Sequence, residues 1–217
     1  MTGFIKTLLN TLYPPKCPFC RRLSEGDTAI CAHCLINLPY TPLGLLPRKG
    51  KYVDEFYSAL YYKGRVRESI LRYKFNGVLG YAEFYAPLLR RCADENGLCP
   101  DVVTWVPLSA RRLHQRGYDQ ARLLAEPLSE YMELDCEGLI KKHRHNLPQS
   151  GRGAEEKRRK NVRGVYRLAR GANVAGKCVL VVDDVVTIGS TLDECAKILK
   201  QAGAKKILAL TLACTMD

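Results

Sequence analysis

Apolar and polar positions follow two different periods beyond residue 53. The run DEFYSALYYKG (54–64) alternates as a strand does, whereas RVRESILRYKFNG (65–77) and LGYAEFYAPLLRRCADENG (79–97) have the spacing of amphipathic helices. The short apolar run DVVTWVPL (101–108) is typical of a buried parallel strand. The pattern then predicts a basic turn and a helix over about 117–132.

The C-terminal part has the order strand, loop, helix, strand. Its pattern predicts a strand over 178–182, a loop over 183–190, a helix over 191–202 and a strand over 206–213. Together with the upstream strand and helices, this order predicts an α/β fold with a mainly parallel sheet flanked by helices. Residues 141–164 are rich in charge and glycine and show no clear periodicity.

The N-terminal part has a different character. Residues 1–16 predict a short helix closed by two prolines, and 17–34 hold two pairs of cysteines. We therefore expect an N-terminal domain over 1–40, with a second domain over 41–217. The first segment carries no small-residue cleavage site, and no apolar run approaches ~18 residues, so we expect neither a signal peptide nor a membrane span.

Charge and cysteine usage narrow the class of protein. The 217 residues carry a formal net charge of +12 with a pI near 9.3. This excess favours polyanionic partners such as nucleic acid or phosphorylated small molecules, although a basic surface also serves solubility alone. Six of the ten cysteines are scattered singly, which fits a reducing compartment and predicts a cytoplasmic protein.

The other four cysteines have the spacing of a metal site. Cys-x2-Cys is followed after ten residues by a second Cys-x2-Cys, so two tight turns direct four thiolates at one tetrahedral ion. We expect a structural zinc ion in a double zinc ribbon-like knuckle, with a redox motif or disulfides as the alternative. The expected ligands are Cys17, Cys20, Cys31 and Cys34.

Two adjacent aspartates end the apolar stretch at the start of VLVVDDVVTIGST (179–191). In open α/β sheets ligands bind beyond the carboxyl ends of strands, and like charges are placed together there when something cationic or hydroxyl-rich is held. Hydroxyl residues and Gly189 then lead into a helix whose N-terminus suits a phosphate. The stretch predicts a ribose 5-phosphate site, and a helix cap beside a solvated acidic pair is the alternative.

This stretch resembles the phosphoribosyl pyrophosphate (PRPP) motif of type I phosphoribosyltransferases. More narrowly, residues 12–217 resemble the ComF/GntX family, which combines a zinc knuckle with that fold. Beside the four cysteines and VLVVDDVVTIGST, the resemblance rests on RYKFNG (72–77), WVPLSARRLHQRGYDQARLLA (105–125) and PQSGRGAEEKRRKNVRGVYRL (148–168). Many relatives have Thr, His and Asn where this chain has Ile188, Ser109 and Asp119, which bears on catalytic competence more than on PRPP binding.

The resemblance implies roles for the matching residues. Asp183 and Asp184 would contact the ribose hydroxyls, with Mg²⁺ bridging these hydroxyls and the pyrophosphate. The residues expected to hold the 5-phosphate are Val185, Val186, Thr187, Gly189, Ser190 and Thr191. Those expected to hold the pyrophosphate, in a loop and as arginine anion clamps, are Leu108, Ser109, Ala110, Arg111, Arg112 and Arg116.

A mobile flap over about 148–164 is also implied by the resemblance. Its expected contacts are Gln149, Arg152, Lys157, Arg158 and Asn161. The basic segment 141–170 holds eleven Lys and Arg against two acids, and it fits either a solvated loop or an arm that contacts pyrophosphate or DNA. We expect residues around 36–65 to build the hood that recognises an acceptor base. Candidates for stacking on bases are Tyr118, Tyr166 and Phe75.

Three functions remain open on this basis. The first, implied by the resemblance, is a PRPP-binding protein that supports uptake or handling of single-stranded DNA in natural transformation, in contact with that DNA or with an uptake helicase. The second is an enzyme that transfers phosphoribose from PRPP to an unidentified base or other nucleophile. The third is a non-catalytic zinc-ribbon protein that binds nucleic acid. The sequence leaves the oligomeric state open.

Overall fold

The computed structural model describes residues 16–23, 30–43, 50–143 and 164–215. The predicted N-terminal helix and the predicted flap residues 149–161 lie outside these ranges.

Four parallel strands form the central sheet, in the order β1-β6-β5-β2. They are β1 (Glu55–Tyr61), β2 (Val102–Trp105), β5 (Cys178–Val186) and β6 (Lys206–Cys214). Strands β5 and β6 lie inside the sheet and read as nearly continuous apolar runs, as strands covered on both faces do. The prediction of a mainly parallel α/β sheet is confirmed. The strand predicted within 54–64 is confirmed as the edge strand β1.

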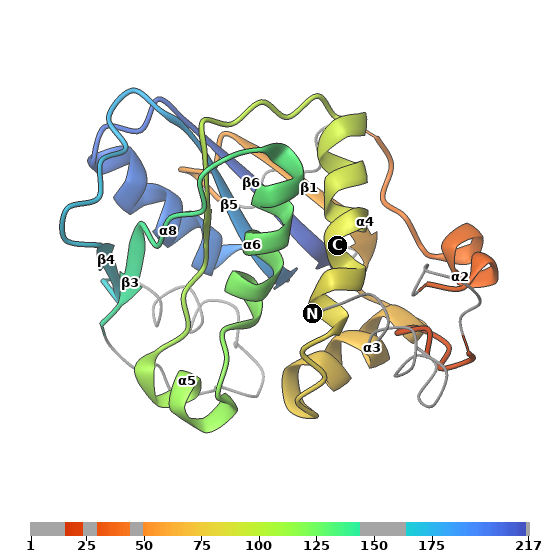
Figure 1. Cartoon of the computed structure of the whole chain (residues 1–217). Coiled ribbons are helices and arrows are strands. Elements are labelled where there is room, and N and C mark those ends of the chain that lie inside the picture. The colour runs from red at the N-terminus through yellow and green to blue at the C-terminus, as the bar shows by residue number, and fades with distance from the viewer. Residues whose placement is uncertain (1–15, 24–29, 44–49, 144–163, 216–217) are drawn as a thin grey trace, which may run out of the picture.

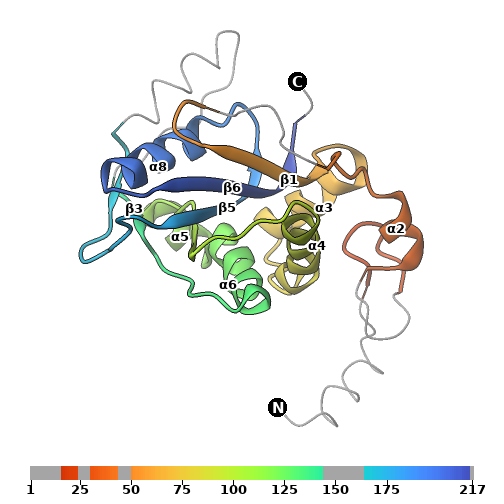
Figure 2. The same ribbon diagram turned by 90° about the horizontal axis from the view of Figure 1, so that it is seen from above.

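Helices cover both faces of this sheet (Figure 1). Figure 2 shows α8 (Ser190–Gln201) on one face and α4 (Tyr81–Glu95) with α6 (Gln120–Met132) on the other. The alternation of side chains along β5 explains the two layers. Leu180 packs in the core beneath α4 and α6, whereas Val181 packs in the core beneath α8. Each fully buried side chain of this size contributes about 1.5–3 kcal/mol.

Two boundaries differ from the predictions. The basic turn after β2 is the short helix α5 (Ala110–Arg116), because the Ser109 hydroxyl accepts a hydrogen bond from the Arg112 N–H (3.4 Å) and Gly117, at φ 77°, ends the turn. The predicted loop beginning at residue 183 is also wrong. Strand β5 continues to Val186, since β6 pairs with it along its whole length.

A small second sheet was missed by the sequence reasoning. Strands β3 (Ile140–Lys142) and β4 (Tyr166–Leu168) pair antiparallel. Each is only three residues long, so neither shows a measurable period within its charged surroundings. This sheet packs against α8, and it flanks the carboxyl edge of the central sheet.

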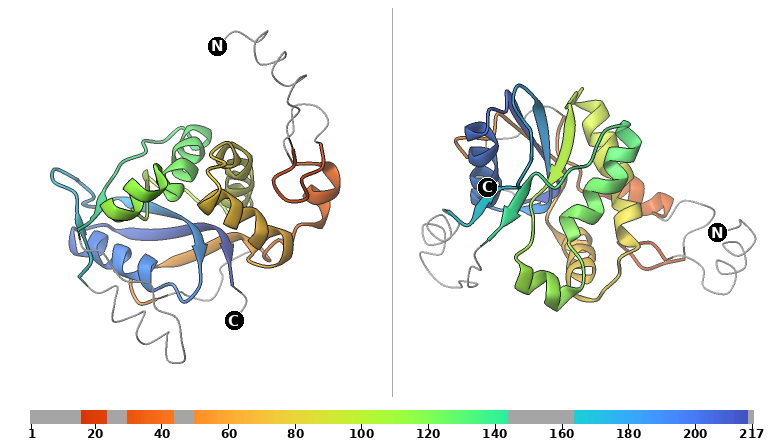
Figure 3. Two further views of the ribbon diagram at one scale, coloured as in Figure 1. Left: turned by 90° about the horizontal axis from the view of Figure 1, so that it is seen from below. Right: turned by 60° about the vertical axis from the view of Figure 1, so that its left-hand side comes forward.

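The cysteine knuckle packs on α3 (Gly64–Phe75), at the side of the sheet away from α8 (Figure 3). It contains the short helix α2 (Ala32–Asn37). The Pro18 carbonyl accepts hydrogen bonds from the Ser69 hydroxyl (2.5 Å) and from the Arg72 guanidinium (2.8 Å). Buried knuckle side chains therefore belong to the same core as α3 and α4. In the ranges that the structure describes, no helix is both long and apolar enough to span a membrane.

Candidate functional site

Segments that lie far apart in the sequence meet at the carboxyl edge of β2 and β5. They enclose a cavity of about 180 Å³. Strand β5 contributes the two aspartates, the segment after β2 contributes residues 106–108, and α3, α5, α6, α8 and the β3–β4 sheet each contribute at least one side chain. Such an edge is where open α/β sheets bind ligands.

The two adjacent aspartates lie in different electrostatic surroundings. Asp184 is buried and forms an ion pair with Lys74, with 2.8 Å between Nζ of Lys74 and Oδ1 of Asp184. Burial alone lowers the pKa of Lys74, but the Asp184 carboxylate holds that pKa above its usual value. Desolvation and the neighbouring Asp184 raise the pKa of Asp183 well above its usual value. The pair thus combines one neutralised carboxylate with one that has no described cation at ion-pair distance.

Cationic side chains line the other walls of the cavity. They are Arg112 and Arg116 from α5 and Lys142 from β3. Burial lowers the pKa of both Arg116 and Lys142, and the charge of Arg112 adds to the effect in each case. Within the part of the chain that the structure describes, Lys142 forms no ion pair, and its Nζ lies 5.0 Å from the centre of the Tyr166 ring. The arrangement concentrates positive charge where an anion would be desolvated.

Asp119 fixes the loop between β2 and α5. One oxygen of its carboxylate accepts a hydrogen bond from the Leu108 N–H (2.9 Å), and the other caps α6 by accepting from the Arg122 N–H (3.4 Å). Burial raises the pKa of Asp119, while these backbone donors oppose the rise. Its role in the structure is therefore to position the loop that follows β2.

Gln120, the next residue, has an unmatched polar group. Its side chain is 2% exposed and lines the cavity, and no described group accepts a hydrogen bond from its Nε2. A buried amide without a partner costs about 1–3 kcal/mol. A ligand oxygen in the cavity would satisfy it.

The N-terminus of α8 borders the same cavity through Thr191. Gly189, at φ 73°, turns the chain from β5 into this helix, a conformation that favours glycine. No side chain caps the first turn, so its N–H groups remain available to an anion. The helix dipole adds to the attraction.

The structure brings together some of the predicted site residues. Asp183, Asp184 and Thr191 line the cavity, as do Leu108, Arg112 and Arg116. The following predicted residues do not line it: Ser109, Ala110, Arg111, Val185, Val186, Thr187, Gly189 and Ser190. Ser109 is buried as the cap of α5, and Thr187 is exposed. The five predicted flap residues lie outside the described ranges.

Of the stacking candidates, Phe75 alone is exposed. The residue is 65% exposed, and the Arg116 guanidinium lies 4.9 Å from the centre of its ring. Tyr166 is buried, and the Tyr118 hydroxyl donates a hydrogen bond to the Tyr73 carbonyl. Phe75 and Arg116 therefore form a cation–π pair beside the cavity.

Lys74 and Gln120 line the cavity but were not singled out by the sequence reasoning. Lys142 was covered only as part of the basic segment 141–170, and Tyr166 was expected to stack on a base, whereas both line the cavity. Lys74 and Gln120 lie in helices that the spacing of apolar residues predicted. That spacing does not show which polar side chain points toward the edge of the sheet. Lys142 and Tyr166 depend on the unpredicted β3–β4 pairing.

The four knuckle cysteines form a closed cluster. Their sulfur atoms all lie within 4.8 Å of one another, and Sγ of Cys20 lies 3.5 Å from Sγ of Cys31. A tetrahedral zinc ion with Zn–S bonds of about 2.3 Å requires sulfurs about 3.8 Å apart, so the cluster fits zinc. Burial raises the pKa of Cys20, but the Arg22 backbone and the neighbouring cysteines more than offset this and lower it to about 7. All four sulfurs belong to residues that also pack on the domain, as a structural site requires.

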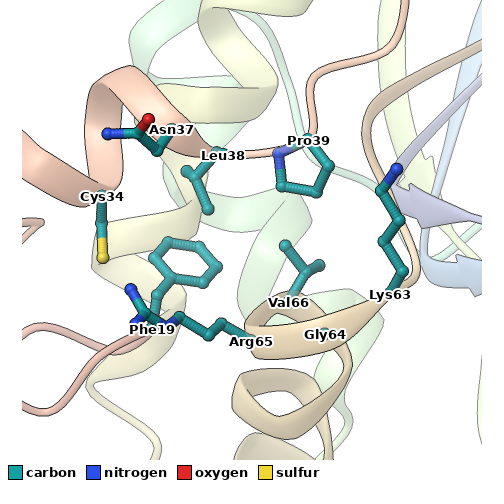
Figure 4. A pocket seen from close by; sticks show the side chains of 9 residues that line it. All are labelled: Phe19, Cys34, Asn37, Leu38, Pro39, Lys63, Gly64, Arg65 and Val66. Atoms are coloured by element: carbon teal, nitrogen blue, oxygen red, sulfur yellow. The ribbon is translucent and has the colours of Figure 1, made fainter.

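A larger cavity, about 410 Å³, lies between the knuckle and the start of α3 (Figure 4). Phe19, Leu38 and Val66 line it, with the side chains of Lys63 and Arg65 at its side. None of its described lining residues carries a carboxylate, and the aspartates of β5 are not among them. Size alone therefore does not mark the chemical centre of this protein.

Two family models match the chain. The phosphoribosyl transferase domain matches residues 119–216, and the double zinc ribbon domain matches residues 8–43. With the parallel sheet and the four-cysteine cluster, they define a phosphoribosyltransferase-type α/β fold that carries an N-terminal zinc ribbon.

Relatives make the assignment narrower. DNA utilization protein YhgH of Escherichia coli O157:H7 is 30% identical over 210 residues, which are 92% of this chain and 90% of the relative. Competence protein F of Haemophilus influenzae is 36% identical over 116 residues, 52% of this chain and 50% of that protein. Competence protein ComFC of Bacillus subtilis is 24% identical over 204 residues, 90% of this chain and 76% of that protein. The chain belongs to the ComF family.

Two solved structures share part of the fold with this chain. The glutamine PRPP amidotransferase of B. subtilis, complexed with ADP and GMP, is 26% identical over 58% of this chain and 25% of its own, with a TM-score of 0.41. Adenine phosphoribosyltransferase of Thermoanaerobacter pseudethanolicus is 14% identical over 66% of this chain and 84% of its own, with a TM-score of 0.39. These scores are too low to carry an argument about ligands.

Proposed function

We propose that the protein binds PRPP in the cavity at the carboxyl edge of β2 and β5. The observation that carries the proposal is the convergence, in one cavity, of two adjacent carboxylates, four cationic side chains and an uncapped helix N-terminus. PRPP pairs vicinal hydroxyls with phosphate groups on both sides of one ribose. The cavity offers acceptors for the former and cations for the latter.

Each part of the ligand has a proposed contact. Asp183 and Asp184 accept hydrogen bonds from the ribose hydroxyls. The 5-phosphate lies at the N-terminus of α8, held by backbone N–H groups and the hydroxyl of Thr191. Arg112 and Arg116 bind the pyrophosphate, because a guanidinium donates two parallel hydrogen bonds to phosphate oxygens.

Mg²⁺ fits this donor set as a companion of the ligand. It prefers oxygen ligands and is held by one or two carboxylates together with phosphate oxygens, and Asp183 supplies such a carboxylate in the cavity. When bound, Mg²⁺ supplies positive charge that offsets the pyrophosphate. The arginines of α5 orient the pyrophosphate, and Asp119 keeps the adjoining loop in place.

The biological role that we propose is support of single-stranded DNA handling during natural transformation, in the cytoplasm. The names of the relatives, which refer to competence and DNA utilization, support it, as does the formal net charge of +12. The proposed partners are single-stranded DNA and an uptake helicase. Transfer of phosphoribose from PRPP to an acceptor is the second candidate function, favoured by the phosphoribosyl transferase match over 119–216.

Titration calorimetry with PRPP and Mg²⁺ tests the proposal. Zinc-loaded wild-type protein is compared with an Asp183→Asn/Asp184→Asn variant that shows the same zinc content and circular dichroism. We expect binding to the wild type and loss of at least about tenfold in affinity in the variant. Absence of binding to folded, zinc-loaded wild type would refute the proposal, and equal binding by both proteins would place the ligand elsewhere.

A further inference from the structure

Lys74 lies within the acidic pair although it comes from a distant part of the chain. It occupies the last turn of α3, and its Nζ lies 2.8 Å from Oδ1 of Asp184. The side chains of Lys74 and Asp184 are only 20% and 9% exposed, so the pair is little screened by solvent. Lys74 also lines the cavity itself. The ammonium has three donors, of which the ion pair with Asp184 uses one.

The charges that line the cavity come to a small positive sum. Its cations are Lys74, Arg112, Arg116 and Lys142, and its carboxylates are Asp119, Asp183 and Asp184, so four positive charges face three negative ones. Without Lys74 the sum is zero, and no cation among the described residues lies at ion-pair distance from Asp183 or Asp184. Two adjacent carboxylates in that state repel each other and demand a cation from solution.

We propose that Lys74 is a built-in counterion of the acidic pair, and that it allows the ribose-phosphate part of a ligand to bind without a divalent cation. The inference rests on the proposed function. The ammonium is paired with Asp184 and occupies the place where a divalent ion bridging both aspartates would otherwise bind. Its positive charge also repels such an ion. A metal ion that arrives with the ligand is therefore left with Asp183 and with the ligand's own oxygens.

The charge of Lys74 and its packing make different predictions. If the residue served only to fasten α3 to β5, its replacement would change stability and affinity alike, with or without Mg²⁺. A counterion has a further signature, because a divalent cation in solution can replace it. The ratio of affinities with and without Mg²⁺ is therefore the quantity that separates the two roles.

Ribose 5-phosphate is the sharper probe for this ratio. It lacks the pyrophosphate, which chelates Mg²⁺ on its own, so any effect of Mg²⁺ on its binding reports the acidic pair. The titration is made in buffer freed of divalent cations without chelator, because a chelator would also remove the structural zinc. It is then repeated with saturating Mg²⁺.

For wild type we expect the Kd for ribose 5-phosphate to change less than about threefold between the two conditions. For Lys74→Met we expect a Kd about tenfold weaker without Mg²⁺ and largely restored by Mg²⁺, the size of one charge-assisted contact. Lys74→Arg keeps the positive charge and should behave as wild type. Lys142→Met is the matched control, since it removes a cavity lysine that is not paired with either aspartate, and it should weaken binding equally in both conditions.

The outcomes separate this inference from the proposed function. A wild-type protein that binds ribose 5-phosphate only with Mg²⁺ would overturn the inference, even if Lys74→Met fails to fold, and would leave PRPP binding intact. Equal Mg²⁺ dependence of wild type and Lys74→Met would overturn it as well. Failure of wild type to bind PRPP with Mg²⁺ would refute the proposed function itself.

Discussion

Replacing each of the two adjacent aspartates by Asn should change the free energy of unfolding in opposite directions. Asp183→Asn and Asp184→Asn each remove one negative charge, keep the shape of the side chain and retain Oδ1. That oxygen accepts a hydrogen bond from the Asp184 N–H in the first case and from the Val185 N–H in the second. The difference between the two variants therefore reports the electrostatic surroundings of each carboxylate.

Asp184→Asn leaves the Lys74 ammonium without its carboxylate partner at 2.8 Å. Breaking a buried ion pair by removing one partner costs about 3–5 kcal/mol, and the 20% exposure of Lys74 favours the lower end, about 3 kcal/mol. For a chain of this size, that cost corresponds to a fall in Tm of roughly 6–12 °C.

Asp183→Asn should instead stabilise the fold at neutral pH. The pKa of Asp183 is raised by burial and by Asp184, so the folded state holds its proton more tightly than the unfolded chain does. The ionised carboxylate therefore costs stability above its unfolded pKa, near 3.9, and the full cost is present once the pH exceeds the folded pKa. The variant removes that cost, and its advantage over wild type should shrink as the pH falls toward 4.

Urea unfolding of zinc-loaded proteins at pH 7.5, 6 and 5 measures both effects. We expect the free energy of unfolding at pH 7.5 to rise in Asp183→Asn and to fall in Asp184→Asn. A loss of stability in both variants, or an advantage of Asp183→Asn that does not depend on pH, would refute the assignment of the ion pair to Asp184 alone.

Three further predictions follow from the site and the knuckle. Removal of zinc by a chelator should unfold the knuckle and expose Phe19, which packs on Tyr85 with ring centres 5.9 Å apart. Limited proteolysis would then show new cuts within 16–43. Unchanged resistance to the protease would argue against structural zinc. Affinity for PRPP should fall on acidification at a higher pH than an ordinary carboxylate predicts, because the raised pKa of Asp183 lets this group take up a proton, which removes its charge and turns one acceptor oxygen into a donor. Titrations from pH 8 to 5 measure this, and a flat profile would contradict it. Gln120→Leu removes a buried amide without a described partner, so the free energy of unfolding should stay equal or rise. PRPP binding should weaken several-fold. Unchanged affinity would show that the ligand does not reach the Gln120 side chain.

The sequence predicted the central fold because its strands and helices have regular periods. The apolar run that begins at Val179 indicated a strand buried on both faces, and the spacing of α4 and α6 indicated helices that cover the sheet. The end of β5 was misplaced because two aspartates look like the end of a strand. Their pairing partner, β6, extends to Cys214 and keeps them within the sheet.

The candidate site was predictable where chemistry and position coincide in one stretch. Asp183, Asp184 and Thr191 belong to one such stretch, which ends in a helix N-terminus, and all three line the cavity. Lys74 was not predictable from its neighbourhood, because its partner Asp184 lies 110 positions away and only the tertiary fold brings the last turn of α3 beside the aspartates of β5. Lys142 was not predictable either, because its position depends on the pairing of β3 with β4, two strands of only three residues each.

The most direct test of the central claim is a crystal structure of the zinc-loaded protein with PRPP and Mg²⁺. We predict that the ribose hydroxyls lie within hydrogen-bond distance of Asp183, the 5-phosphate at the N-terminus of α8 beside Thr191, and the pyrophosphate near Arg112 and Arg116. PRPP bound in the cavity between the knuckle and α3, or with the phosphates turned away from α8, would contradict the claim.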